Sequence, residues 1–226
     1  ALLLSTGFVL LWDATHQDFP VEGVEWPTSA AGSDGWLVSV EEDPESMSVS
    51  ISVWNVSDEH GSMISGEPWA SSPAVAISGS SLVLHDSHRL DYYELESNST
   101  EFSPKFSRNE SEVVLDVAIA ESATGQALLV VVHEDYLEVM DNEQATVGFE
   151  APGEVFSIVA ASGQLVAWAD GTSSSPIVNV TSISGSISIS LVLDARASAD
   201  EDEFLEEISG IAVDYSHAEV IDMDMD

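Results

Sequence analysis

Short apolar segments alternate with turns along almost the whole chain. Six of them share a pattern in which a large residue near the end of the segment lies beside an acidic or amide residue. The anchor positions of these six copies are Trp12, Trp54, Tyr93, Met140, Asn179 and Ile221, spaced by 42, 39, 47, 39 and 42 residues. A spacing this regular predicts an internal repeat of about 40 residues.

Further apolar segments precede the anchors and complete each repeat. A second segment precedes each anchor from the second onward, at residues 35–40, 81–85, 127–133, 164–168 and 210–214. Three repeats show an earlier one, at residues 74–78, 115–119 and 155–159. Four short strands in about 40 residues make one blade of a β-propeller. We therefore predict an all-β propeller of about six four-stranded antiparallel blades, with partial terminal blades.

The same pattern predicts one domain over residues 1–226, as a segment of a larger protein. A segment of a seven- or eight-bladed ring is the alternative. Residues 1–12 are interpreted as two buried strands joined by a turn, because no basic segment precedes them as in a secretory signal. Residues 182–191 alternate apolar and serine positions, which predicts an outer strand. Residues 199–208 are predicted to form either a short helix or an acidic loop.

Two segments carry a family resemblance. Val9-Leu-Leu-Trp12-Asp13-Ala14-Thr15 and Ile51-Ser-Val-Trp54-Asn55-Val56 resemble the third blade strand of WD-repeat and quinoprotein-like propellers. The resemblance implies a propeller fold. It suggests a scaffold that binds other molecules, or a quinoprotein-like redox enzyme.

The charge of the chain is extreme. It has 41 acidic and 4 basic residues among 226, a net charge of −37, yet 44% are hydrophobic, which is enough for a folded core. So few cations exclude a nucleic-acid binder with a basic face and oppose docking on anionic lipid. The absence of cysteine excludes disulfides, zinc–thiolate sites and thiol nucleophiles.

The acidity also bears on the compartment. Like charges repel one another in dilute buffer, and molar salt screens them, so either a salt-rich cytoplasm or the outside of a halophilic or marine cell fits. Asn-x-Ser/Thr triplets occur at Asn55, Asn98, Asn109 and Asn179. We favour an extracellular or cell-surface location, with a high-salt cytoplasm as the alternative.

Calcium is the one cofactor that the sequence suggests. Asp222, Asp224 and Asp226 follow the Asp-x-Asp-x-Asp opening of a calcium-binding loop. His85 and His88 flank a predicted turn, where two solvated imidazoles need not converge on a metal.

Three tryptophans, Trp26, Trp36 and Trp69, lie near predicted loops or strand starts. They are candidates for a binding surface, with anchoring of loops to the core as the alternative.

These observations favour a non-catalytic platform that binds a protein or glycan partner through its loop faces. No nucleic-acid partner and no membrane insertion by this segment are expected. A quinoprotein-like or hydrolytic propeller enzyme is the alternative, although the sequence has no Gly-x-Ser-x-Gly element to mark a nucleophile. A structural repeat without a ligand is the third possibility.

Overall fold

The chain folds into short strands in a computed structural model. The structure describes residues 2–5, 8–12, 18–20, 27–43, 45–55, 61–64, 68–97, 99, 101–134, 136–141, 146–152, 158–169, 177–183, 188–192, 210–214 and 217–221. Among these residues no helix is long and apolar enough to cross a membrane. The chain divides into two compact units, Ala1–Asn109 and Glu110–Asp226, which are described separately.

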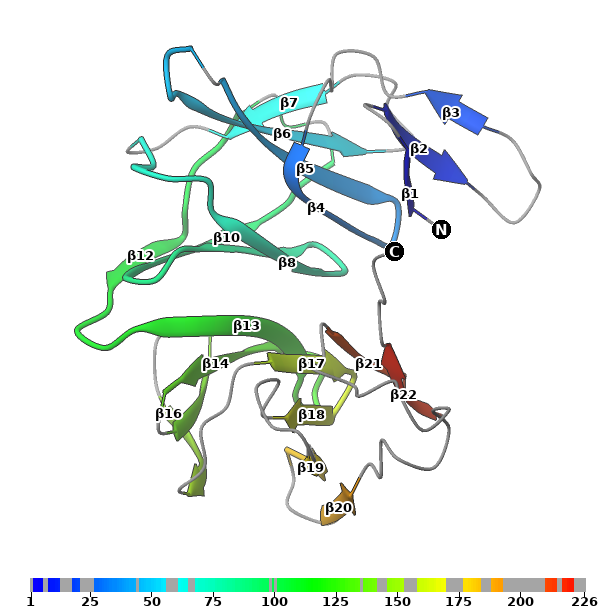
Figure 1. Ribbon diagram of the computed structural model, residues 1–226, viewed down its shortest axis with the longest axis vertical. Coiled ribbons are helices and arrows are strands. Elements are labelled where there is room, and N and C mark those ends of the chain that lie inside the picture. Colours follow the sequence, from blue (N-terminus) through cyan, green and yellow to red (C-terminus); the bar gives the residue numbers. More distant parts are fainter. Residues whose placement is uncertain are drawn as a thin grey trace, which may run out of the picture. The chain divides into compact units, whose positions relative to one another are not determined.

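The described residues of the first unit form three sheets (Figure 1). The first has the order β1-β2-β3, with β1 (Leu2–Ser5), β2 (Phe8–Trp12) and β3 (Asp18–Pro20). The second has the order β11-β7-β6-β5-β4, with β4 (Pro27–Ser33), β5 (Trp36–Glu42), β6 (Val49–Asn55), β7 (Gly61–Ile64) and β11 (Glu101–Phe102). The third has the order β12-β10-β9-β8, with β8 (Ala74–Ser78), β9 (Ser81–His85), β10 (Arg89–Glu94) and β12 (Phe106–Asn109).

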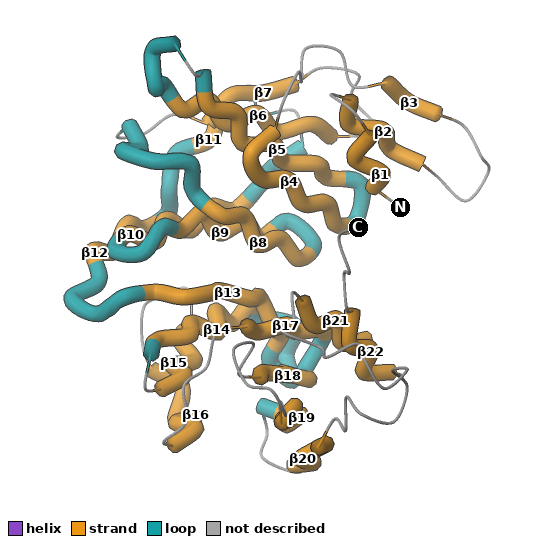
Figure 2. The backbone as a smooth tube through the Cα atoms, viewed as in Figure 1, coloured by secondary structure: helices purple, strands orange, loops and turns teal. Residues whose placement is uncertain are grey.

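The described residues of the second unit also form three sheets, and Figure 2 shows their strands in orange. One is formed in chain order by β13 (Val114–Glu121), β14 (Ala127–His133), β15 (Tyr136–Asp141) and β16 (Thr146–Pro152). Another is formed by β17 (Ile158–Ser162), β18 (Leu165–Ala169), β19 (Ile177–Ser182) and β20 (Ser188–Val192). The last pairs β21 (Gly210–Asp214) with β22 (His217–Ile221).

The predicted order of strands within a repeat is confirmed in the second unit. Sheets β13–β16 and β17–β20 each consist of four consecutive antiparallel strands, as expected for blades. The predicted strand over residues 182–191 is wrong in its bounds. Strand β19 ends at Ser182, Ile183 lies in a turn, and β20 begins at Ser188. A turn is required there because β20 runs back antiparallel to β19.

Each turn between the first and second strands of a four-strand repeat contains a glycine with positive φ. These glycines are Gly35, Gly79, Gly125 and Gly163, with φ of 84°, 57°, 78° and 54°. Only glycine adopts this backbone without strain, so the four positions form a second repeat signal. Neighbouring turns are also bonded: the Gly79 N–H donates to Ser33 Oγ at 3.0 Å, and the Glu121 N–H donates to Gly163 O at 2.6 Å.

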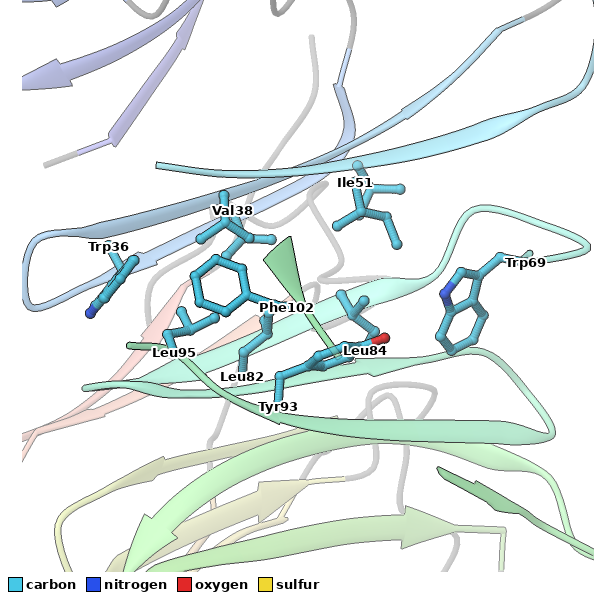
Figure 3. Close-up of a cluster of buried hydrophobic side chains, with 11 residues drawn as sticks. Trp36, Val38, Ile51, Trp69, Leu82, Leu84, Tyr93, Leu95 and Phe102 are labelled. Atoms are coloured by element: carbon cyan, nitrogen blue, oxygen red, sulfur yellow. The ribbon is translucent and has the colours of Figure 1, made fainter. Parts of the chain in front are cut away.

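A hydrophobic core lies between the β4–β7 and β8–β12 sheets of the first unit (Figure 3). Val38, Ile51, Leu82 and Leu84 meet there from alternating positions of three strands. Phe102 completes the cluster, because the short strand β11 pairs in parallel with β7 and brings its ring within 6.2 Å of Trp36. The sheet edge at β7 is thereby covered.

The second unit has its own core. It consists mainly of β-branched and other apolar side chains of β14, β15, β17 and β18, among them Val130, Val132, Leu137, Val139, Val159, Val166 and Trp168. All six residues from Leu128 to His133 are buried, as expected for an inner strand with both faces covered.

Candidate functional site

Three connections lie together at one end of the first unit, and we call them the loop face. They are the β5–β6 loop (residues 43–48), the described part of the β7–β8 loop (residues 68–73) and the β9–β10 turn (residues 86–88). Two hydrogen bonds connect them through the adjoining strands. Ser72 Oγ donates to Glu42 Oε2 at 2.6 Å, and Arg89 Nη1 donates to Pro68 O at 3.3 Å.

A buried ion pair supports this face. Arg89 and Asp91 share one side of β10 because their positions differ by two. Arg89 binds the carboxylate with both Nη2 and Nε, at 2.6 Å and 3.1 Å, and the Asp91 side chain is fully buried. The Arg89 guanidinium also lies 4.2 Å from the centre of the Trp69 ring. The ion pair and the cation–π contact therefore hold the β7–β8 loop against β10.

Tyr93 lies on the same side of β10 as Arg89 and Asp91, two positions further along the strand. Its hydroxyl donates to Asp91 Oδ2 at 3.3 Å. Burial raises the pKa of Tyr93 far above its usual range, and the Asp91 charge adds to that shift. The phenol therefore stays protonated as a hydrogen-bond donor, and Asp91 is engaged on both oxygens in structural contacts.

The β5–β6 loop is closed by its own hydrogen bonds. Asp43 accepts from Ser46 Oγ at 2.7 Å and from the Glu45 N–H at 2.9 Å, and these bonds lower the pKa of the Asp43 carboxyl. The Met47 N–H donates to Asp43 O at 2.7 Å, and the Asp43 N–H donates to Ser48 O at 3.0 Å. Met47 is held with φ of 55° and 65% of its surface exposed. It is the most exposed large hydrophobic residue in the described part of the chain.

The two histidines of the β9–β10 turn differ in environment. Asp86 Oδ1 accepts the backbone N–H groups of His88 and Arg89, both at 2.8 Å, which shapes the turn. His88 is exposed, but His85 is buried at the end of β9, so the expectation of two solvated imidazoles is wrong for His85. Burial lowers the pKa of His85 to about 4, and the side chain is neutral at pH 7.

Two of the tryptophans proposed for a binding surface lie in the core. Trp36 and Trp69 are 9% and 8% exposed and belong to the hydrophobic cluster of the first unit (Figure 3). Their burial favours the core-anchoring alternative. Trp26 lies outside the described residues, as do Asp222, Asp224 and Asp226, so these candidates stay predictions. In the described ranges no group of three or more His, Asp or Glu residues is placed to hold a metal ion.

The second unit has a polar cluster at the β14–β15 turn. His133 is 1% exposed, its Nδ1 lies 3.1 Å from Val113 O, and its ring stacks on Tyr136 at 4.4 Å. The Glu138 carboxylate lies 3.9 Å from His133 Nε2. Burial raises the pKa of Tyr136 to about 12, with further contributions from a hydrogen bond to Glu112 and the surrounding carboxylates. These contacts join the turn to the segment that precedes β13.

Asp116 connects two sheets of the second unit. It sits at an irregularity in the β13–β14 pairing. Its Oδ2 accepts the Val159 N–H of β17 at 2.8 Å, and its Oδ1 accepts the Val117 N–H at 2.9 Å. Burial nevertheless raises the pKa of Asp116 to about 6, because two backbone donors do not replace the lost water.

We expect wild type to lose stability relative to Asp116→Asn as the pH rises from 4 to 7. Between pH 4 and 6 the folded chain binds more protons at this carboxyl than the unfolded chain does, so its contribution to stability falls as pH rises through that window. Between pH 4 and 7 the stability of D116N relative to wild type should rise by roughly 2 kcal/mol, after allowance for partial exposure. The amide retains only one of the two acceptor oxygens, and that cost is the same at every pH. Urea unfolding from pH 4 to 7 measures the rise.

Glu121→Gln is the matched control, since Glu121 is an exposed acid on the same strand. It removes the same charge and should change stability by less than about 0.5 kcal/mol. A stability difference between D116N and wild type that stays constant from pH 4 to 7 would contradict the raised pKa of Asp116 in the folded chain.

The residues that organise these sites were not among the site residues predicted from the sequence, although some of them carry a recognisable signal. Arg89, Asp91 and Tyr93 do follow a readable signal, because alternate polar positions in a predicted strand share one face. Asp43 and Ser46 carry a turn signature three residues apart. The partnership of Asp116 with Val159 has no local signal, because 43 positions separate the two residues.

Comparisons with known proteins support the fold. No family model matches the sequence. No curated protein matches it either. Solved structures do: a protein from Lactobacillus plantarum matches with a TM-score of 0.55 and 12% identity, over 88% of this chain and 65% of that one. TolB from Acinetobacter baumannii matches with a TM-score of 0.53 and 13% identity, and the match covers 82% of this chain and 48% of TolB. A eukaryotic initiation factor matches with a TM-score of 0.50 and 12% identity, and the match covers 84% of this chain and 51% of that factor.

The matches confirm the predicted fold class. This is an all-β protein with the fold of β-propellers, built of small sheets. The chain spans about half to two thirds of the length of the structures it matches. The number of blades, and whether one domain covers residues 1–226, stay predictions. At 12–13% identity the similarity concerns the fold alone.

Proposed function

We propose that this chain is a non-catalytic binding platform whose loop face contacts a protein partner. The observation that carries the proposal is Met47, an exposed apolar side chain on a loop that is closed by its own hydrogen bonds. A single exposed apolar side chain is common at protein surfaces, and Met47 is distinguished by the hydrogen bonds and the left-handed backbone that present it. Hydrogen bonds within the loop reduce the conformational entropy that it loses on binding.

The backbone at Met47 supports the same interpretation. Its left-handed conformation costs on the order of 1 kcal/mol in a residue other than glycine. The bonds to Asp43 sustain that conformation and direct the side chain outward. Strained, over-determined residues of this kind concentrate at functional positions. The flexible thioether of methionine adapts to apolar pockets of varied shape.

Charge defines the partner further. Glu42, Asp43 and Glu45 lie within five positions of the exposed methionine in the sequence, and the whole chain carries a charge of −37. An apolar pocket rimmed by Lys or Arg complements this face. A glycan partner is the second possibility retained from the sequence. An extracellular or cell-surface location belongs to the same proposal, since partners of such platforms are met there.

The test compares binding by two variants with lysine at opposite ends of the first unit. The full chain is immobilised and exposed to arrays of purified extracellular proteins and of glycans, in salt at which circular dichroism shows it folded. For a protein that binds, Met47→Lys should weaken affinity at least about tenfold, because it puts a cation into the apolar contact. Ser80→Lys, at an exposed turn position at the other end, should leave affinity unchanged.

Three results would overturn the proposal. The first is that nothing on either array binds. The second is a protein partner that binds M47K and S80K as tightly as it binds wild type. The contact with the partner would then not involve Met47. Binding confined to the glycan array would contradict the protein partner and select the glycan possibility.

A further inference from the structure

The four Asn-x-Ser/Thr triplets of the sequence occupy different structural settings. Asn109 is the last residue of the edge strand β12, and its side chain is exposed. The hydroxyl residue of its triplet, Ser111, is exposed as well, in the segment that leads to β13. Both groups that an N-glycosylating enzyme must reach are therefore at the surface.

The other described asparagines are less accessible. Asn55 ends β6, pairs across the sheet with Trp36 and is half-buried. Asn179 lies inside β19, between Trp168 of β18 and Ser190 of β20. Thr181 of the same triplet is only 3% exposed. A glycan at Asn179 would interfere with a strand that is paired on both sides. Asn98 lies outside the described residues.

We propose that Asn109 is an acceptor for an N-linked glycan. The inference rests on the proposed extracellular location, because the modification requires passage through a glycosylating compartment. The co-reactant is an oligosaccharide linked to a lipid through diphosphate. The Asn109 amide nitrogen forms a bond to the anomeric carbon, the bond from that carbon to the phosphate oxygen breaks, the amide loses one proton, and the lipid diphosphate leaves. No oxidation or reduction is involved.

The position gives the glycan a structural consequence. Strand β12 is an edge of its sheet, and an uncovered edge is a template for pairing with another chain. Asn109 lies opposite Arg89, at the end of the edge that adjoins the loop face. A bulky hydrophilic group there would obstruct edge-to-edge pairing. It would not cover the β5–β6 loop, because β5 and β6 belong to a different sheet, so the loop could still bind its partner.

The test uses the full chain secreted from eukaryotic cells behind a cleavable signal, with Asn98→Gln as the background so that the undescribed triplet contributes nothing. Intact mass is measured before and after enzymatic removal of N-glycans. We expect one glycan mass in the background protein, which Asn109→Gln and Ser111→Ala each abolish and Asn179→Gln retains. S111A keeps Asn109 itself, so its loss of mass would identify the triplet and not a folding defect.

Two results would overturn the assignment: a background protein with the mass of the bare chain, or an N109Q protein that keeps the glycan. Neither result bears on the proposed platform, because partner binding through Met47 is measured on unglycosylated protein. Conversely, a failure of M47K to weaken binding leaves the masses unaffected. The two proposals therefore fail separately.

Discussion

Replacing Arg89 with methionine is expected to destabilise the first unit by roughly 3–5 kcal/mol. The substitution leaves the fully buried Asp91 without its bidentate cation, and only the Tyr93 hydroxyl still donates to it among its described side-chain contacts. It also removes the guanidinium from the Trp69 ring and the bond to Pro68 O. Urea unfolding at a fixed high KCl concentration, followed by tryptophan fluorescence, measures the loss.

A double variant separates charge from packing. Arg89→Met with Asp91→Leu replaces the pair by apolar side chains, and such replacements are often neutral or stabilising. We expect it to recover part of the stability lost in R89M, because the buried Tyr93 hydroxyl also loses its acceptor. Arg89→Lys keeps the charge without the planar fork and should fall between wild type and R89M. An R89M protein within about 1 kcal/mol of wild type, or a double variant no better than R89M, would contradict the assigned role of the pair.

The strands of the fold were predictable because their apolar runs are short and bounded by turns. Residues 81–85 and 127–133 were predicted as strands and are β9 and β14. These inner strands are buried along their length, so their sequences are nearly continuous apolar runs. The outer strands face solvent on one side and carry a weaker signal. The division of residues 182–191 into the end of β19 and β20 was missed because apolar and serine positions alternate through the whole segment, so the pattern does not mark where β19 ends.

The sites were less predictable because they depend on contacts between segments far apart in the chain. Trp69 was identified by its residue type, but its place beneath Arg89 depends on how a loop 20 residues upstream packs on β10. His85 and His88 looked equivalent in sequence, yet the first ends a buried strand and the second lies on an exposed turn. Local sequence specifies the elements, whereas burial and partners follow from register and packing.

The basic residues are concentrated in one sheet. Arg89, Lys105 and Arg108, three of the four cations in the sequence, lie on or beside β10 and β12. Arg89 is committed to Asp91, and Lys105 lies 3.4 Å from Glu94, with both side chains about half exposed. An exposed pair of that kind contributes little to stability and is screened by salt. The four basic residues thus offset only a small part of the 41 acidic charges, which leaves a net charge of −37.

Stability should therefore rise steeply between dilute buffer and about 2 M KCl. The screening length falls to about 3 Å at molar salt, which removes most repulsion between exposed carboxylates. We expect the melting temperature, followed by circular dichroism, to rise on the order of 10 °C or more over that range. An uncharged osmolyte such as sucrose at matched osmolality serves as the control for general exclusion effects. A melting temperature that stays flat in KCl would mean that the acidic charge is already neutralised locally.

Millimolar calcium distinguishes general screening from specific sites. At that concentration it adds almost nothing to the ionic strength, so a rise comparable to that in molar KCl requires bound ions. Asp222, Asp224 and Asp226 are the candidates, and replacing all three with asparagine should then abolish the calcium effect while leaving the KCl effect in place. If calcium has no effect and KCl does, the carboxylates act collectively as a salt-adapted surface, and the hypothesis of a calcium site at these three residues is wrong.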